Sequence, residues 1–305
     1  MRRSLLVLLC AGVLSAGSAS SGLPPIQANA GNQSVNCESD GIEGKRIEVV
    51  YLYPAGTRNK ERDRIPVLYR ALNKLDRVWN SAADPFDQHP RWLCRPNGPR
   101  PIITTVQGPP IGSDGVYTFA EVVRALKRAG YASTSRVYLI FADHVHSAFA
   151  PGGQATTDDD DRPSSSNLNN IGPAYAMVDA GDTRWNWSRM WAGALHELGH
   201  ALGAVQCTAP HSTCRPGELG HHHCWDEHDV MCYDDGGSYY KGRDQVADSP
   251  DDRTVSVRCG EGSTAADQWD CGKDDYFNIA PVSGSYLATH WNLAMSGFVT
   301  RPRPE

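Results

Sequence analysis

The segment that most constrains this chain is residues 194–206, ALHELGHALGAVQ. His196 and His200 are four residues apart, so on a helix their imidazoles project from one face and can share a metal ion. Glu197 lies beside them and can hold a water molecule at the open coordination position. The segment therefore predicts a metal-binding helix over residues 189–202, with Gly203 letting the chain leave it at positive φ.

The pairing of two histidines with a glutamate predicts a particular chemistry. Zinc held by such ligands lowers the pKa of a bound water toward neutrality. Glu197 can take the proton of that water as it attacks a carbonyl carbon, and can then deliver the proton to the leaving amine. The expected reaction is hydrolysis of an amide bond, with Glu197 as general base and acid.

The segment HELGHALG resembles the metzincin zinc peptidases, whose motif is His-Glu-x-x-His-x-x-Gly-x-x-His followed by a methionine turn. The stretch DVMCY, residues 229–233, looks like that turn. The resemblance implies that Met231 lies under the metal and that Tyr233 is a fifth ligand or transition-state donor. It also implies that the strand before the helix, AYAMVDAG at residues 174–181, binds extended substrate.

More widely, the chain from RIEVVYLYP to GSYLATHWN resembles a group of secreted actinobacterial metalloproteins. The order of the expected strands and helices implies a mixed α/β sheet with helices packed against it, and the metzincin resemblance implies that this sheet is twisted. The metal-binding helix would form the floor of a cleft, and the carboxy-terminal part would be irregular and rich in disulfides.

The chain departs from the metzincin motif at Gln206, which stands where the third ligand is expected. A neutral glutamine carbonyl is a poor zinc ligand compared with imidazole, thiolate or carboxylate. Three replacements are His211, His223 in a run of three histidines, and Asp226. We predict His211, because a loop closed by neighbouring cysteines would hold it near the helix; His223 is the next choice.

The amino terminus predicts export. Residues 1–22, MRRSLLVLLCAGVLSAGSASSG, have a basic start, a short apolar run and then small residues, the layout of a signal peptide. We expect the signal to end near residue 20, or as late as residue 30, with a flexible lead to residue 45. The apolar run is shorter than the roughly 20 residues of a membrane span, so we expect a secreted protein without stable membrane insertion.

The cysteines fit an exported chain. The sequence has nine, and removal of the signal peptide with Cys10 leaves an even number, which indicates disulfides. Eight cysteines allow 105 connectivities, so the pairing is predicted only from proximity in sequence. The expected pairs are Cys37–Cys94, Cys207–Cys214, Cys224–Cys232 and Cys259–Cys271.

Hydrophobic periodicity predicts an α/β fold in one catalytic domain over residues 46–300. Residues 46–203 would form an upper part of sheet and helices, and residues 204–300 a lower, loop-rich part. Strands are expected at residues 46–54, 101–107, 136–143 and 174–181, and helices at 65–83, 118–130, 189–202 and 285–295. Residues 151–173 are expected to be a surface loop, whose acidic run DDDDRP could hold calcium or be simply solvated.

Charge and composition narrow the function. A net charge of -6 and a pI near 6.0 give no reason to expect a nucleic-acid partner. The predicted function is that of a secreted, monomeric zinc endopeptidase acting on a protein or peptide substrate. The alternative is a catalytically inactive, zinc-stabilised binding or cell-surface protein, which the departure at Gln206 permits.

Overall fold

The computed structural model describes residue 37 and residues 42–96, 98–113, 115–145, 153–180, 190–214, 222–224, 229–232, 268–270 and 272–304. The predicted signal peptide lies outside these residues, as do Tyr233, Asp226 and the predicted Cys259–Cys271 pair. No helix in the described ranges is both long and apolar enough to cross a membrane.

Five strands form the main sheet in the order β3-β1-β4-β6-β5. They are β1 (Arg46–Ala55), β3 (Ile103–Pro110), β4 (Arg136–Ala142), β5 (Gly153–Ala155) and β6 (Ala174–Asp179). All neighbours are parallel except β5, which runs antiparallel to β6 at one edge. In the register, Val50 of β1 lies opposite both Thr104 and Ile140, and Ile140 lies opposite Met177. The mixed α/β fold predicted from the sequence is confirmed.

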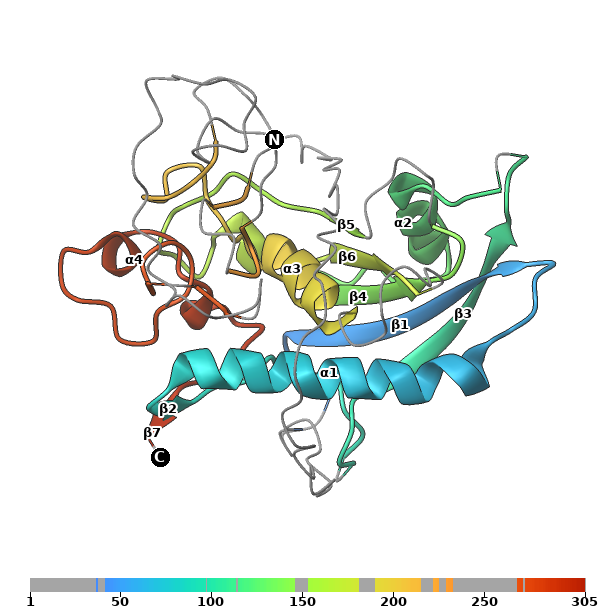
Figure 1. The fold of residues 1–305 in the computed structure, drawn as a ribbon, viewed down its shortest axis with the longest axis horizontal. Helices are drawn as coiled ribbons and strands as arrows, with labels where there is room; N and C mark the ends of the chain where they lie inside the picture. Colours follow the sequence, from blue (N-terminus) through green and yellow to red (C-terminus); the bar gives the residue numbers. More distant parts are fainter. Residues whose placement is uncertain are drawn as a thin grey trace, which may run out of the picture.

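The inner strands β1, β4 and β6 are largely buried on both faces of the sheet, because they are mostly apolar. Helices α1 (Glu61–Ala83) and α3 (Met190–Leu202) share one core with Ile47, Val49 and Tyr51 of β1. Helix α2 (Phe119–Arg128) shares the other core with Val50 and Leu52. The alternation along β1 thus places α1 and α3 on one face of the sheet and α2 on the other (Figure 1).

The capping residues predicted at the start of helix α2 are present, whereas helix α1 starts earlier than predicted. Thr118 caps α2 by accepting the backbone N–H of Glu121, whose side chain in turn accepts the N–H of Thr118. Helix α1 begins at Glu61, four residues before the predicted start. The carboxylates of Glu61 and Asp63 in its first turn favour that earlier start through the helix dipole.

Two predicted elements are wrong in part. The expected helix over residues 285–295 is only one turn, α4 (Tyr286–Thr289), followed by a 3-10 turn, η2 (Leu293–Met295). The chain turns between them because the Trp291 N–H bonds to the Asp161 carbonyl and the Asn292 side chain accepts the N–H of Ala294.

The expected loop over residues 151–173 contains β5 and a 3-10 turn, η1 (Leu168–Asn170). Residues 174–179, expected from the resemblance to bind substrate, form the inner strand β6 between β4 and β5. A strand inside a sheet has both edges paired and cannot accept another strand. The edge position belongs to β5.

Three disulfides cross-link the described residues. Cys37–Cys94, Cys207–Cys214 and Cys224–Cys232 are formed as predicted. Three disulfides are consistent with an oxidising, extracellular environment. A short two-stranded sheet of β2 (Phe86–Asp87) and β7 (Arg303–Pro304) brings the carboxyl end of the chain to the end of α1 (Figure 1).

His89 joins α1 to this carboxy-terminal segment. Its Nδ1 lies 2.9 Å from Asp76 Oδ2 on α1, and its Nε2 lies 2.7 Å from Asp87 Oδ1. Its backbone exchanges hydrogen bonds with Thr300. Burial lowers the pKa of His89, but the hydrogen bonds and negative charges of Asp76 and Asp87 outweigh burial, so the pKa is raised. The imidazolium therefore bridges two carboxylates in the folded protein.

Replacement of His89 by glutamine should destabilise the protein in a pH-dependent way. Because the folded-state pKa is raised, the imidazolium contributes its full stability below the unfolded pKa of about 6.5 and loses it as pH rises through the folded pKa. Urea unfolding of wild type and His89→Gln at about pH 6 and about pH 9 should show the larger stability difference at the lower pH. An equal difference at both pH values would contradict this account.

Candidate metal centre

Helix α3 carries the motif residues into the interior. It has 13 residues, is mostly apolar and packs against β6, β5 and α1. His196, Glu197 and His200 lie on this buried helix and are 7%, 2% and 4% exposed. Burial on all sides fixes the direction of these polar side chains, because each must find a partner inside the protein.

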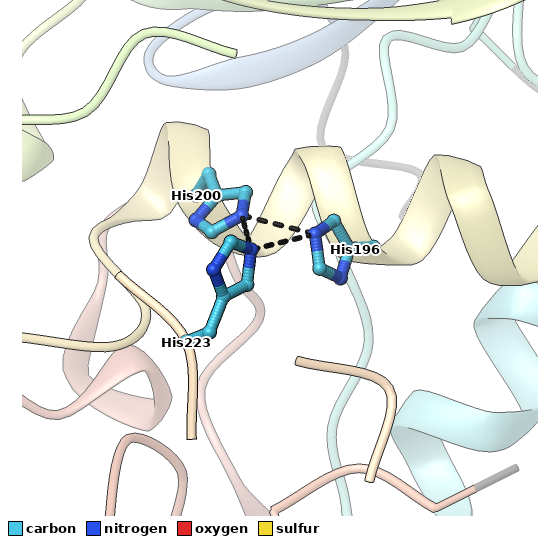
Figure 2. A group of neighbouring side chains, drawn as sticks. All are labelled: His196, His200 and His223. Carbon is cyan, nitrogen blue, oxygen red and sulfur yellow. Dashed lines mark hydrogen bonds between the residues drawn. The ribbon is translucent and has the colours of Figure 1, made fainter. Parts of the chain in front are cut away.

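His223, from the segment 222–224, completes a group of three histidines with His196 and His200 (Figure 2). The three Nε2 atoms are separated by 3.0 Å, 3.2 Å and 3.3 Å. Zinc–nitrogen bonds of about 2.0–2.1 Å in a tetrahedral site place ligand atoms roughly 3.3 Å apart. The nitrogen positions therefore match those of three ligands around one ion.

The tautomers of two of these histidines follow from their other ring nitrogens. His196 Nδ1 lies 2.7 Å from the Val230 carbonyl, and His200 Nδ1 lies 3.1 Å from the Ala204 carbonyl. A carbonyl oxygen only accepts, so each Nδ1 carries the proton and each neutral Nε2 presents a lone pair. Two facing lone pairs cannot form a hydrogen bond with each other, but a cation between them satisfies both.

Burial keeps these imidazoles neutral. It lowers the pKa of His196 to about 4, although the Val230 carbonyl acts in the opposite direction. Burial, followed by the charges of His196 and His222, lowers the pKa of His200 well below its usual range. Both rings are therefore unprotonated at neutral pH, which is the state that binds a metal.

The third member of the group corrects the sequence prediction. His211 does not join His196 and His200 but lies with Asp274 and Asp275. Gln206 is buried, and its amide nitrogen donates to the carbonyls of Gly203 and Asp158. His223 was the next choice from the sequence, and the feature that pointed to it is its position beside Cys224.

The Cys224–Cys232 disulfide explains why His223 reaches the helix. It ties the segment carrying His223 to residues 229–232, the predicted methionine turn. Met231 of that turn is fully buried under α3. A Cβ atom at Gly199 would lie 2.5 Å from Met231 Sδ and 2.9 Å from Trp269, so only glycine allows this close approach.

A buried polar network supports the same turn. Asp229 Oδ1 accepts the Met231 N–H at 2.7 Å and the Tyr276 hydroxyl at 2.6 Å. The Tyr276 oxygen in turn accepts the N–H of Asp270 at 2.6 Å. The turn then places the Val230 carbonyl against His196. Tyr276 belongs to the stretch KDDYFN, residues 273–278, so this distant stretch helps to hold the turn.

Asp270 is a second buried carboxyl of this network. Its oxygens accept backbone N–H groups from Asp274, Asp275, Tyr276 and Phe277. Burial raises the pKa of Asp270 well above its usual range, and the negative charges of Asp275 and Asp229 raise it further. The hydrogen bonds from the backbone act in the opposite direction but are outweighed. The carboxyl thus organises the chain around Tyr276.

Strand β5 passes directly beside Glu197. A Cβ atom built on Gly153 would overlap the Glu197 carboxylate and lie 2.6 Å from its Cγ. The absence of a side chain at Gly153 therefore lets the sheet edge approach the predicted general base. The carboxylate and the edge strand are therefore in close contact.

The acidic run after β5 is engaged with protein partners. Asp160 accepts two hydrogen bonds from the Arg162 guanidinium, Asp161 accepts the Thr208 hydroxyl, and Asp159 lies 3.3 Å from His222 Nε2. Within the described ranges, no aspartate of this run belongs to a group of side chains that could hold a metal ion. The arrangement gives no support to a calcium site in this loop.

No protein-family model matches this chain, and no curated protein matches it.

Tyr276→Phe tests whether the buried network supports the histidine group. Loss of the hydroxyl leaves buried partners unsatisfied, which should destabilise the protein by about 1–3 kcal/mol. If the network positions His196 through Val230, zinc affinity should also fall about 10-fold or more, as it does when residues behind metal ligands are removed. Urea unfolding and zinc competition with a chelator measure the two effects.

Tyr69→Phe is the matched control. Its hydroxyl donates to the Pro101 carbonyl at 3.2 Å, next to the start of β3. This variant should keep the zinc affinity of wild type. Unchanged zinc affinity in Tyr276→Phe would show that the network contributes to stability alone.

Proposed function

We propose that this protein is a secreted, metzincin-like zinc endopeptidase whose metal ligands are His196, His200 and His223. The observation that carries the proposal is the convergence of three buried imidazole Nε2 atoms beside a buried glutamate. Three disulfides in the described residues and the predicted signal peptide support an extracellular location.

The ligand set favours zinc over other common ions. Neutral imidazoles suit zinc and similar transition ions, whereas calcium and magnesium prefer oxygen. Three protein ligands leave a fourth position open, which is typical of catalytic zinc sites; structural sites have four protein ligands. When bound, zinc acidifies a coordinated water and polarises a substrate carbonyl.

Glu197 supplies the proton transfers. Its carboxylate accepts a proton from the attacking water and donates it to the nitrogen of the departing amine. A zinc site that served only to stabilise the fold would not need this carboxylate. The glutamate follows His196 directly on α3 and is 2% exposed, so its position is fixed by the helix and by β5.

Strand β5 offers a means of positioning substrate. It lies at the sheet edge, and an extended peptide can add to such an edge through main-chain hydrogen bonds. A peptide bound there would run past Glu197, because Gly153 brings this strand against the glutamate. This geometry favours an extended polypeptide as the substrate.

Glu197→Gln separates metal binding from catalysis. The amide cannot accept the proton of water, so cleavage of an unfolded protein substrate should fall by at least about 100-fold. Zinc content should stay at the wild-type level. His223→Ala should lose activity and the zinc bound at this centre, because only two of its imidazoles remain. Mass spectrometry of bound metal and a fluorescent-casein assay measure both quantities.

Glu61→Gln, on the exposed first turn of α1, is the matched control and should retain zinc and activity. A wild-type protein that binds zinc and cleaves no unfolded substrate would contradict the peptidase proposal. That result would instead favour an inactive, zinc-stabilised binding protein.

A further inference from the structure

We propose that His211, Asp274 and Asp275 form a second binding site, for a zinc ion, that is separate from the His196–His200–His223 group. These three side chains place one ligand atom each within 4.8 Å of one another. They come from two segments about sixty residues apart in the sequence, and neither segment belongs to α3.

The distances between the candidate ligand atoms suit a single ion. His211 Nδ1 lies 3.1 Å from Asp275 Oδ2 and 3.7 Å from Asp274 Oδ1. These values lie close to the roughly 3.3 Å separation expected of ligands around a tetrahedral zinc. The Cys207–Cys214 disulfide closes the loop that carries His211, which limits the movement of the imidazole.

A contact between His211 and Asp275 explains only part of this arrangement. The Asp275 carboxylate accepts from both the backbone N–H and the ring Nδ1 of His211, at 2.9 Å and 3.1 Å. Asp274 then brings a second carboxylate to the same imidazole. One imidazolium neutralises one carboxylate, whereas a divalent ion neutralises two and also accepts the lone pair of a neutral imidazole.

The surroundings add negative potential to the site. Tyr286 lies beside it, with its hydroxyl 2.7 Å from Thr208 Oγ1, and Thr208 donates to Asp161. Burial is the main cause that raises the pKa of Tyr286 to about 12. The Thr208 hydrogen bond acts in the opposite direction, and the negative charges of Asp161 and Asp275 add the smaller part of the rise. It is these carboxylates near the site that favour a cation.

The burial of the three side chains fits a site that an ion can reach. Asp275 is 6% exposed, whereas the side chains of His211 and Asp274 are 25% and 27% exposed. One ligand is thus fixed in the interior and two lie near the surface. Imidazole with two carboxylates suits zinc better than calcium, which takes oxygen ligands.

A zinc ion at this position would brace the first metal centre. The loop with His211 joins α3 to the segment that carries His223, and the loop with Asp275 continues into Tyr276. Both connections lead to residues that position His196 or supply a third imidazole. The second ion would therefore cross-link two supports of the first site.

Zinc titration of the full secreted chain tests the proposal. Wild type should bind about two equivalents, the tighter one at the three-histidine group. Asp274→Asn is the decisive variant, because it keeps the His211–Asp275 hydrogen bonds and removes one ligand. It should bind about one equivalent and lose the rise in melting temperature caused by the weaker equivalent. His211→Ala should behave in the same way.

His223→Ala identifies the two equivalents. It should lose the tighter one and keep the weaker one, and its combination with Asp274→Asn should bind none. Asp63→Asn, at an exposed position on α1, is the control and should bind as wild type does. Circular dichroism confirms that each variant is folded.

The outcomes distinguish this proposal from the one above. If wild type binds a single equivalent that His223→Ala removes and Asp274→Asn leaves unchanged, the second site is overturned and the first stands. If Asp274→Asn loses an equivalent and His223→Ala loses none, the second site stands and the three-histidine centre is overturned.

Discussion

Three imidazole nitrogens are held face to face in the interior of this protein, and much of the surrounding structure serves to hold them there. Carbonyl groups fix the protons of His196 and His200 on Nδ1, which leaves their Nε2 lone pairs directed at each other and at His223. Burial keeps His196 and His200 neutral. Such an arrangement is unfavourable by itself and becomes favourable when a cation joins the nitrogens.

The three histidines depend on supports from distant parts of the chain. The sheet and α1 bury α3, and the Cys224–Cys232 disulfide ties the segment with His223 to the methionine turn. Gly199 admits Met231 beneath the helix, and Tyr276 holds the turn through Asp229. The described segments at residues 222–224, 229–232 and 268–277 are thus held around the centre by hydrogen bonds and a disulfide.

Local signals in the sequence predicted four of the five strands of the main sheet, the three long helices and the pairing of His196 with His200 on α3, since periodicity and the i, i+4 spacing depend only on neighbouring residues. The third histidine of the group could not be chosen from the sequence, because His211 lies inside the Cys207–Cys214 loop, His223 lies just before the Cys224–Cys232 loop, and only tertiary structure orients them. The single turn at α4 was overestimated because apolar spacing does not reveal a competing contact such as Trp291 with Asp161. Short edge strands such as β5 likewise carry too few residues for a periodic signal.

The most direct test of the metal centre is a crystal structure of the zinc-bound protein with anomalous data collected at the zinc absorption edge. We predict an anomalous peak about 2.0–2.1 Å from Nε2 of each of His196, His200 and His223. The fourth position should be held by water on the side of Glu197. If zinc is bound elsewhere and no peak lies between the three imidazoles, the central claim is contradicted.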